Sequence, residues 1–411
     1  MTSKVAKAME KKRIPKRRFR EFLAAGEWEE KKLGEIAPII MGQSPDGSSY
    51  TNNPSDNILV QGNADMRERK VFPRVWTKQV TKIGQKGDII ISVRAPVGDV
   101  GKTDYNVVLG RGVAAIRGKE FLYQSLIKLE FNKYWSNVST GTTFDSIDSK
   151  TLSVVEIALP LTEEQQKIGD FCRRLDTLIS LHQQKLAKLK DLKQAYLTEM
   201  FPAPGEKRPR RRFKGFSRDW IAVSLGELMT FSNGFNGSKE MYGQGIRYIS
   251  VMDILNNDYI VYDNIRGQVA LERELAQNFS VSYGDVLFQR SSETFDEAGT
   301  SNVYVDSERN AVFGGFVIRG KKMADYDAFF MKHLLDSSAI RKQIISRAQG
   351  AQHINVGQDT LVNVAILMPD REEQQLIGSF FKNISAKIDN QSKYISKLQS
   401  LKQAYLSELF V

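Results

Sequence analysis

Cysteine and histidine are scarce in this sequence. Its 411 residues include one cysteine, Cys172, and three histidines. A single cysteine excludes a disulfide framework, and so small a set cannot supply an ordinary Cys/His zinc site. We therefore expect no metal centre and a reducing, cytoplasmic environment.

Long apolar runs are missing as well. No run approaches the roughly 18 apolar residues that a membrane span requires, and the basic N-terminal stretch contains no apolar segment of the kind found in a signal peptide. We expect a soluble, intracellular protein that does not bind a membrane.

Recognisable catalytic motifs are also lacking. The chain has no Pro-Pro pair, and so it lacks the Asn/Asp-Pro-Pro-aromatic motif with which amino-methyltransferases hold a flipped base; H-E-x-x-H and G-x-S-x-G are absent too. "VGDVGKT" resembles a phosphate-binding loop, but Pro96 stands where its first glycine is needed. "GRGVAA" from Gly110 matches a dinucleotide pattern by letter only, and a hairpin is the better interpretation. The sequence indicates no catalytic site.

What the chain does have is positive charge. The formal net charge is +11 and the pI is near 9.4. Clustered Lys and Arg favour a polyanionic partner, because binding releases counterions from the polyphosphate. Charge alone would fit a ribosome or a lipid surface equally well. The length suits two domains of ordinary size rather than one core.

An internal repeat organises the chain. "PLTEEQQKIGDF" from Pro160 aligns with "PDREEQQLIGSF" from Pro369 at an offset of 209 residues, and the same offset continues without a gap to "LKQAYLTEMF" and "LKQAYLSELF". Of the 42 aligned positions, 19 are identical. Each half also opens on a similar motif, "WEEKKLGEI" from Trp28 and "WIAVSLGEL" from Trp220. The frame is duplicated, while the bodies between these motifs have diverged.

The repeated tails are predicted to be long helices. Thr162 followed by Gln165 is typical of a capping box, and no proline interrupts the first tail before Pro202. Apolar residues recur at steps of three, four or seven, which favours a coiled-coil seam, and forty residues give a rod of roughly 60 Å. The predicted seam consists of Leu175, Ile179, His182, Leu186, Leu189, Tyr196 and Met200 in the first helix, and of Ile384, Ile388, Gln391, Ile395, Leu398, Tyr405 and Leu409 in the second.

Polar residues occupy one equivalent position of this seam. His182 and Gln391 correspond at the offset of 209. A polar side chain in a seam can fix the register at some cost in stability, and we give these two residues that role as a hypothesis. An amphipathic helix packed on its own domain is the alternative for either tail alone.

The two bodies are predicted to be mixed α/β domains. Short apolar runs alternate with turn signals, as in "NILVQG", "KGDIIISVRAPVGDVGKT" and "NAVFGGFVIRG", which indicates strands and hairpins. The segment from Ala328 to Gly350 has a helical pattern, and the proline-rich, charged stretch around residues 202–216 indicates a linker.

The order of these motifs resembles the specificity subunit of type I restriction-modification systems. The resemblance covers nearly the whole chain after the basic leader and rests on "GDIIISVRAPVGDVG", "LPLTEEQQKIGDF", "LKQAYLTEMF" and the second round of the last two motifs. It implies an α+β chain with two target-recognition domains held apart by an antiparallel helix pair, each reading half of a bipartite, asymmetric site on double-stranded DNA. It also implies that the helices dock two methyltransferase subunits, to which restriction/translocase subunits add.

The resemblance further implies a subunit without chemistry of its own. It would bind no cofactor, whereas the complex would use S-adenosylmethionine, ATP and Mg. The predicted domains are a basic leader 1–20, a first target-recognition domain 21–155, a central helical region 156–203, a linker 204–214, a second target-recognition domain 215–365 and a C-terminal helical region 366–411.

Candidate DNA-binding residues lie at strand ends and in loops. Arg reads guanine, Asn or Gln reads adenine, and Ser or Thr reads either. The candidates are Gln61, Asn63, Arg67, Arg94, Arg111, Thr142 and Thr143 in the first body, and Arg247, Arg290, Ser291, Ser292, Gln352 and His353 in the second. A solvated side chain or a structural hydrogen bond is the alternative for each, and an internal ion pair is a further alternative for Arg94 and Arg290.

Two other classes of protein remain open at this stage. A fused methyltransferase-nuclease would need the missing Pro-Pro motif and room for a catalytic domain. A coiled-coil scaffold that binds protein would not explain why the chain has two diverged basic bodies. Salt-dependent, sequence-selective DNA binding distinguishes the scaffold from a DNA reader.

Overall fold

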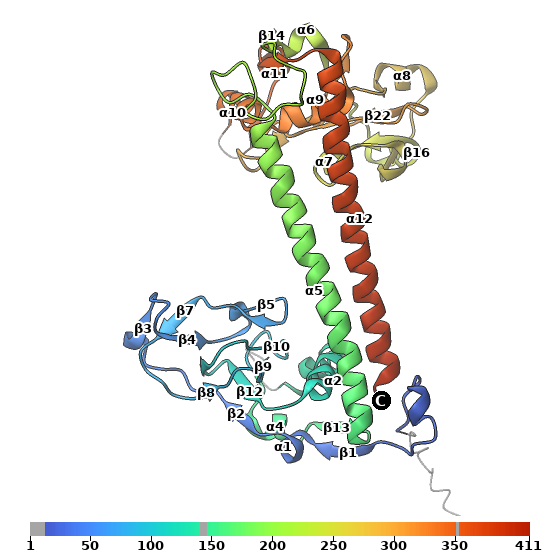
Figure 1. The fold of residues 1–411 in the computed structure, drawn as a ribbon. Helices are drawn as coiled ribbons and strands as arrows, with labels where there is room; N and C mark the ends of the chain where they lie inside the picture. Colours follow the sequence, from blue (N-terminus) through green and yellow to red (C-terminus); the bar gives the residue numbers. More distant parts are fainter. Residues whose placement is uncertain (1–12, 140–145, 351–352) are drawn as a thin grey trace, which may run out of the picture. The chain divides into compact units, whose positions relative to one another are not determined.

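The computed structural model describes residues 13–139, 146–350 and 353–411. The chain forms two compact units (Figure 1). Unit 1 combines Met1–His182 with Tyr394–Val411, and unit 2 comprises Gln183–Lys393. Each unit therefore contains one body together with part of each long helix, α5 (Thr162–Glu199) and α12 (Arg371–Leu409). We describe the units one at a time.

Two main sheets form the body of unit 1 among the described residues. One has the strand order β2-β12-β9-β10-β6-β5 and the other β3-β7-β4-β11-β8, while β1 pairs with β13 apart from them. The strands are β1 (Glu29–Lys32), β2 (Ile39–Met41), β3 (Tyr50–Thr51), β4 (Asn57–Val60), β5 (Met66–Arg67), β6 (Lys70–Val71), β7 (Val75–Thr77), β8 (Ile83–Gly84), β9 (Ile89–Ser92), β10 (Val100–Lys102), β11 (Val107–Leu109), β12 (Val113–Ile116) and β13 (Glu156–Leu159).

Strand β9 is buried on both faces. Ile89 and Ile91 belong to an apolar cluster with residues of α2 (Glu120–Phe131), whereas Ile90 packs with Leu109 of the second sheet. This is why the sequence there is a continuous apolar run rather than an alternation. The central sheet thus lies between a second sheet and a helical layer. The short helices of unit 1 are α1 (Leu33–Ile36), α3 (Tyr134–Val138) and α4 (Ser149–Ser153).

Unit 2 repeats this plan with different strands. Its described sheets have the orders β15-β23-β19-β21, β17-β16-β22-β18, β14-β25 and β20-β24. The strands are β14 (Ile221–Ser224), β15 (Met229–Asn233), β16 (Tyr242–Ile249), β17 (Gly267–Val269), β18 (Ser280–Val281), β19 (Val286–Gln289), β20 (Ser291–Ser292), β21 (Ser301–Val303), β22 (Ala311–Phe313), β23 (Val317–Lys322), β24 (Ile354–Asn355) and β25 (Ala365–Met368).

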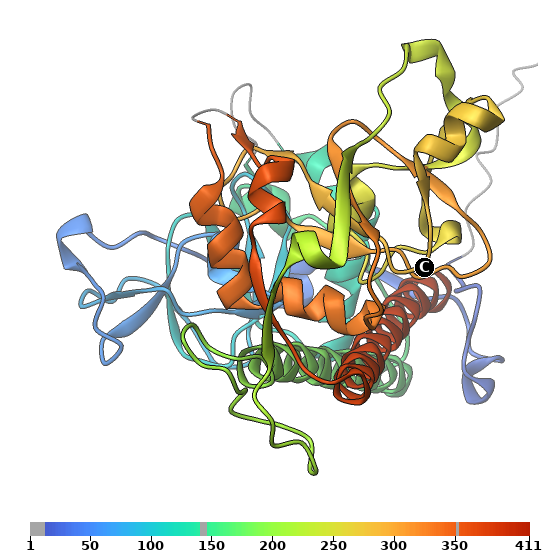
Figure 2. The ribbon, with the colours of Figure 1, turned by 90° about the horizontal axis from the view of Figure 1, so that it is seen from above.

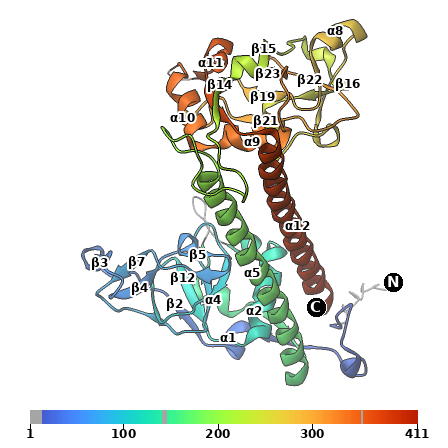
Figure 3. The same cartoon turned by 45° about the horizontal axis from the view of Figure 1, so that its top comes forward.

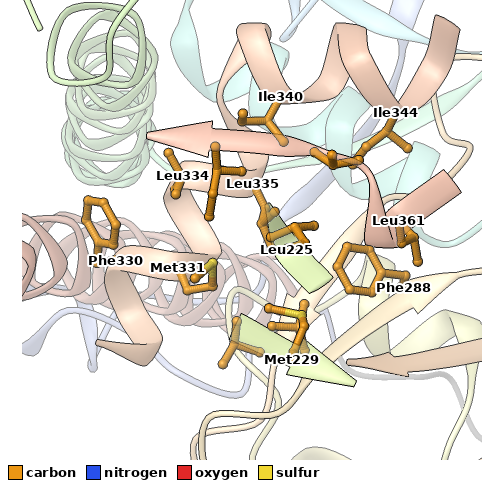
Figure 4. Close-up of a cluster of buried hydrophobic side chains, with 14 of the residues drawn as sticks. Leu225, Met229, Phe288, Phe330, Met331, Leu334, Leu335, Ile340, Ile344 and Leu361 are labelled. Carbon is orange, nitrogen blue, oxygen red and sulfur yellow. The ribbon is translucent and has the colours of Figure 1, made fainter. Parts of the chain in front are cut away.

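Helices cover one face of the β19 sheet. The helices of unit 2 other than those of the long pair are α6 (Leu225–Leu228), α7 (Val251–Leu255), α8 (Arg273–Asn278), α9 (Ala328–Asp336), α10 (Ser338–Arg347) and α11 (Gln358–Val362). Figure 4 shows Leu334 and Leu335 of α9 and Ile344 of α10 gathered with Phe288 of β19 in one apolar cluster. On the other face of the sheet, Leu287 packs with Phe313 of β22. The segment predicted as one helix from Ala328 is therefore two, because the chain turns at Ser337.

The two long helices run antiparallel in unit 1. Phe171 of α5 meets Tyr405 of α12 edge to face, with 4.8 Å between ring centroids, and His182 lies 4.6 Å from Tyr394. The contacting residue number rises along α5 as it falls along α12, which fixes the antiparallel sense. Inside unit 2 the pair Tyr196–Phe380 repeats the Phe171–Tyr405 contact at the offset of 209, again at 4.8 Å. Together with the mixed sheets, the helices confirm the predicted α+β class.

The predicted seam residues differ in burial, and two of them, Met200 and Leu409, pack in the apolar clusters of the bodies. Ile179, Met200, Ile384, Gln391, Ile395, Leu398 and Leu409 are buried, and Leu175, His182, Leu186, Leu189, Tyr196, Ile388 and Tyr405 are half-buried. The register role proposed for His182 and Gln391 stays a prediction.

Each body also holds the end of the helix that belongs to the other repeat. In unit 1, Phe410 after α12 stacks on Phe121 of α2, with ring centroids 5.0 Å apart, and lies edge to face with Trp28. In unit 2, Phe201 after α5 packs in the same way against Trp220 and Phe330. The duplicated tryptophan and the duplicated tail motif thus form one apolar joint in each unit. Figure 3 shows the ribbon of unit 2, in which α9 lies beside α12.

A buried ion pair completes each joint. Arg18 donates through Nε and Nη2 to both carboxylate oxygens of Glu164, at 2.7 Å each, and Arg212 does the same to Glu373 at 2.6 and 2.7 Å. Both glutamates are fully buried. Each arginine precedes a phenylalanine shortly before the opening motif of its repeat, and it therefore binds the distant Glu-Glu-Gln-Gln motif of the same repeat.

The predicted capping box at Thr162 is wrong. Thr162 is already the first helical residue, and the Gln165 side chain donates instead to the carbonyl of Pro160 at 2.9 Å. Gln374 and Pro369 repeat this contact in unit 2. The linker after α5 is an open loop without regular structure (Figure 2). Within the described residues, no helix combines the length and apolarity that crossing a bilayer demands.

Candidate nucleic-acid interface

A polar depression of about 540 Å³ lies at one edge of the body of unit 1. Four of the predicted DNA-binding residues line it together: Gln61, Asn63, Arg94 and Arg111. Three different loops supply them, one after β4, one after β9 and one between β11 and β12. The structure thus brings together residues that are up to 50 positions apart in sequence.

Sheet geometry explains the convergence. Strands β4 and β11 are parallel neighbours, with Leu59 opposite Val108, so their carboxyl ends reach the same edge. Strand β9 ends opposite the start of β12, where Ser92 pairs with Val113. The loops that follow these ends must therefore emerge side by side, on the edge where ligands of open sheets bind.

The loop that carries Arg111 is not a hairpin. β11 and β12 belong to different sheets, and the chain crosses from one to the other through Gly110, Arg111 and Gly112. A Cβ on Gly112 would lie 2.0 Å from the carbonyl oxygen of Gln61, so the crossing requires glycine there. The hairpin expected for this segment is wrong, because the parallel pairing of β11 with β4 takes β11 away from β12.

The cationic side chains of the depression are available to a ligand. Arg94 and Arg111 are exposed, and neither guanidinium forms an ion pair with a described residue. Backbone contacts hold both residues in place. The Arg111 amide donates to Ser44 Oγ at 3.1 Å, and the backbone of Arg94 forms a single antiparallel β-bridge with Ser146. An internal ion pair for Arg94 therefore has no support in the described part of the chain.

The neutral residue Gln61 is held by two contacts. Its amide nitrogen Nε2 donates to Tyr50 Oη at 2.8 Å, and its backbone amide donates to Asp65 Oδ2 at 2.7 Å. Tyr50 and Ser44 both line the depression and were missed from the sequence. In the sequence they belong to a polar stretch after an apolar strand, and such stretches are too common to identify a binding site.

The remaining predicted residues of the first body lie elsewhere. Arg67 is exposed on β5, where its guanidinium carbon lies 4.9 Å from the centre of the Phe72 ring. It does not line the depression. Thr142 and Thr143 lie outside the described residues.

In unit 2 the predicted residues divide between two places. Arg290 and Ser291 follow β19, as Arg94 follows β9 in unit 1, and Arg290 Nη1 donates to the Gly315 carbonyl at 3.4 Å. Arg247 instead lies about 5.9 Å from the Tyr262 ring, which it shares with Arg309. There the Arg309 guanidinium lowers the pKa of the Asp263 carboxyl, so Arg247 borders a structural ion-pair cluster.

Two further residues need separate comment. Ser292 is buried, with Oγ accepting from the Thr294 amide at 3.1 Å and donating to Glu297 at 3.3 Å. It stabilises its own loop and does not present its hydroxyl at the surface, which corrects the expectation for it. His353 is exposed beside β24, and Gln352 lies outside the described residues.

Backbone contacts give the correspondence between the two bodies. The Val93 amide donates to Gly112 and the Ile147 amide donates back to Val93, just as Arg290 donates to Phe316 and receives from Val356. Arg290 thus corresponds to Val93, and Ser291 to Arg94. By the same contacts Gly315 corresponds to Arg111, so the two arginines of the depression have no charged counterpart in unit 2.

No group of three or more His, Cys, Asp or Glu side chains suited to a metal ion occurs among the described residues. The depression offers cationic and amide donors and no nucleophile with an adjacent base. Its chemistry suits recognition of an anionic, hydrogen-bonding surface such as the edge of a nucleic acid groove.

Comparison with known proteins finds matches to specificity subunits. The family of type I restriction modification DNA specificity domains matches residues 25–191 and again residues 217–400. The type I restriction enzyme MjaIX specificity subunit of Methanocaldococcus jannaschii is 23% identical over 406 residues, which covers 93% of this chain and 92% of that protein. A shorter match, 33% identical over 177 residues, covers 41% of this chain and 41% of the MjaX specificity subunit of the same organism.

A solved structure shares the fold. The crystal structure of the S subunit of a type I restriction-modification system from M. genitalium has a TM-score of 0.64 at 16% identity, and the match covers 97% of this chain and 99% of that one. At this identity the likeness shows the fold alone. Since the two family matches together span most of the sequence, the chain belongs to the type I restriction-modification DNA specificity family.

Proposed function

We propose that this chain is the DNA sequence-specificity subunit of a type I restriction-modification complex and reads a bipartite, asymmetric site through its two bodies. The observation that carries the proposal is the depression of unit 1, where Arg94, Arg111, Gln61 and Asn63 converge with both guanidinium groups unpaired by described residues. These residue types match the hydrogen-bonding edges of guanine and adenine in the major groove.

In this proposal each side chain has a distinct part. Arg111 and Arg94 donate to guanine O6 and N7 or to a phosphate, and Gln61 presents an amide whose orientation Tyr50 holds. Such pre-organisation favours discrimination, because a misplaced amide would lose one of its two hydrogen bonds to adenine.

Differences between the bodies account for an asymmetric site. Unit 2 offers Ser291 and Gly315 where unit 1 offers two arginines, while Arg290 and His353 are exposed nearby. The two halves of the site are therefore expected to differ in sequence, as a duplicated frame with diverged bodies permits.

The helices are proposed to dock two methyltransferase subunits, to which restriction/translocase subunits add. Leu192 of α5 and Leu401 of α12 correspond at the offset of 209, and each is 43% exposed despite lying on a helix with a buried face. Matched apolar positions suit two copies of one partner. The chemistry, with S-adenosylmethionine, ATP and Mg, is assigned to those partners, and this subunit is proposed to be non-catalytic.

The test is selection of DNA sites by the assembled complex from a randomised duplex library. The proposal predicts one enriched motif made of two defined parts separated by a spacer of fixed length, with an affinity that falls as salt rises. Enrichment of a single contiguous motif, or of none at any salt concentration, would refute it.

A further inference from the structure

We propose that unit 2 contains an anion site that binds a phosphate group, at the end of the sheet away from the proposed DNA-reading loops. The observation is a second depression of about 820 Å³ beside α8 (labelled in Figure 1). It is lined by Arg319, Lys321 and Lys322 of β23 together with Asn278, Ser280 and Ser282.

Arg319 is the centre of the argument because it is a buried charge without an ionic partner. It is 9% exposed, and burial lowers its pKa. Nη1 donates to the carbonyl of Ser280 and the guanidinium lies 5.2 Å from the Phe313 ring. Nε has no hydrogen-bond partner in the described part of the chain. A buried charge without a counter-ion destabilises the fold unless a ligand or another group compensates it.

The fold itself does not need a charge at this position. Arg319 pairs with Leu287 of β19, and in unit 1 Ala115 pairs with Ile90 of β9. Leu287 and Ile90 each lie three residues after the glycine of a Gly-Asp turn, Gly284 and Gly87. The equivalent residue in unit 1 is therefore a buried alanine, which fills the position without any polar atom.

The nearest acid, Asp285, attracts Arg319 through space but is held by other donors. Asp285 accepts from the Ser282 amide at 3.0 Å and from the Lys322 amide at 2.9 Å, so both of its oxygens hold the turn. In unit 1, Asp88 accepts from the Gln85 amide at 2.8 Å and so holds the equivalent turn. It does so although the residue equivalent to Arg319 in that unit is Ala115. No ion pair joins Asp285 to Arg319 among the described residues.

The other cations make the depression positive overall. Lys321 is exposed, and Lys322 donates to the Tyr326 carbonyl at 2.9 Å while lying 3.9 Å from Asp325. Three cations thus face two acids, Asp285 and Asp325, so an anion of one or two charges brings the site close to neutral. A forked guanidinium, a lysine and serine hydroxyls are the donors that suit phosphate.

The ligand class is therefore a phosphate group, either on a free phosphomonoester or inorganic phosphate, or in a DNA backbone. The depression has room for more than a bare ion. The five steps along β23 from Val317, next to the loop that carries Phe316, to Lys322 cover roughly 17 Å at about 3.3 Å per residue. A DNA source would therefore extend the contact beyond the reading loops.

The experiment measures binding of inorganic phosphate to the full chain by calorimetry and by thermal shift, with sodium chloride adjusted to keep ionic strength constant. We expect saturable binding and a rise in Tm with phosphate. Arg319→Ala, which installs the residue that unit 1 has, is expected to weaken phosphate binding at least about tenfold. Arg210→Ala removes an exposed charge from the linker of the same unit, outside the depression, and is expected to leave phosphate binding unchanged.

Lys321→Ala keeps the test decisive if the Arg319 variant does not fold, because Lys321 is exposed. It is expected to weaken phosphate binding about threefold. Absence of saturable binding by the native chain overturns the proposal, and so does equal phosphate affinity in the native chain and in both site variants.

A DNA arm identifies the source of the phosphate. If Arg319→Ala weakens binding of a non-specific duplex and phosphate competes with that duplex, the site holds a backbone phosphate. If duplex binding is unchanged in the variant that has lost phosphate binding, the site holds a free phosphate compound. The inference does not depend on the proposed function, since phosphate binding is measured without cognate DNA or partner subunits.

Discussion

Arg111 owes its exposure to the glycines on either side of it. Gly110 and Gly112 let the chain cross between two sheets close to the backbone of Gln61, and Arg111 between them stays exposed. The residue type and the loop could be predicted from the sequence. The convergence with Arg94 and Gln61 could not, because it depends on parallel pairing of β4 with β11, a contact between strands about 50 residues apart.

The first prediction concerns this residue. Arg111→Ala is expected to raise the Kd for the selected DNA site by about 5- to 150-fold, the equivalent of about 1–3 kcal/mol for a lost bidentate contact. It should also relax the preference at one or two positions in only one half of the site. Fluorescence anisotropy with single-substitution duplexes measures both effects.

The control for this variant is Arg67→Ala. It removes the same charge from the same unit, outside the depression. An account based on general charge predicts equal losses of affinity for the two variants, with the same base preferences retained. Such a result contradicts the assignment of Arg111 to base reading.

His333 gives a prediction about pH. It is 1% exposed, stacks on Phe381 at 4.5 Å, and pairs through Nε2 with Tyr259 Oη at 2.8 Å. Burial, with Lys193 and Lys332 nearby, holds its pKa well below the usual value of 6.5. The unfolded chain therefore binds a proton before the folded chain does, so stability is present above pH 6.5 and is lost as the pH falls below it.

We expect the free energy of unfolding to fall by about 1.4 kcal/mol for each pH unit below about 6.5 from this group. Gln124 of unit 1 is the equivalent residue, since it lies three positions after Phe121 as His333 lies three after Phe330. His333→Gln should therefore flatten the dependence of the free energy of unfolding on pH between pH 6.5 and 5. Urea unfolding followed by tryptophan fluorescence at several pH values measures the slope. The same slope in both proteins would show that another group is responsible.

At the scale of elements, the duplication made the helices predictable. Two copies of one tail at a constant offset indicated both long helices, and their antiparallel packing follows within each unit from contacts such as Phe171–Tyr405. The start of α5 was predicted wrongly in detail because Gln165 bonds to the Pro160 carbonyl rather than to the backbone at Thr162. Local hydrogen bonds of this kind have several competing solutions that sequence alone does not rank.

The bidentate ion pairs were beyond sequence reasoning. Arg18 and Glu164 are separated by 146 positions, and Arg212 and Glu373 by 161. Nothing in either motif identifies the other as its partner. Each motif was visible as a repeated string, yet its partner became evident only in three dimensions. Their burial at the joint between helix and body explains why both strings occur twice.

The pair in unit 2 gives a prediction at this scale. Glu373→Gln is expected to lower the free energy of unfolding by about 3–5 kcal/mol, because it leaves Arg212 largely buried without its counter-charge. Urea unfolding with Trp220 as a probe of unit 2 measures the loss.

Arg211→Ala is the matched control, since Arg211 pairs with Glu199 at the surface of the same segment. Its removal should change the free energy of unfolding far less, because solvent screens an exposed ion pair. Equal losses for the two variants would contradict the importance given to burial of the Arg212–Glu373 pair.

The helices also carry a prediction about spacing. Seven residues inserted after His182 in α5 and seven after Lys393 in α12 lengthen both helices by about 10 Å, or roughly three base pairs of B-DNA. We expect the selected DNA motif to gain about three unread positions while both half-sites stay the same. An unchanged spacer, with both half-sites retained, refutes the idea that helix length sets the gap.

At the scale of the whole molecule, the chain is two units built on one duplicated frame. Length and repeat predicted two bodies and the charge favoured a polyanionic partner. The motif order predicted the family, which the family matches to residues 25–191 and 217–400 confirm. Which loops face a ligand could be predicted only as a broad set, because residues of the right chemistry are common on any basic surface. Four of them meet in one depression, whereas Ser292 bonds within its own loop and Arg67 and Arg247 lie beside aromatic rings elsewhere.

The most direct test of the central claim is a map of modified bases in the host genome by long-read sequencing, with the gene intact and with it deleted, while the methyltransferase partner is expressed in both. The account predicts that N6-methyladenine disappears from one bipartite motif on deletion and that the motif has two unlike halves. Methylation that is identical in the two strains would contradict the claim that this chain selects the DNA site.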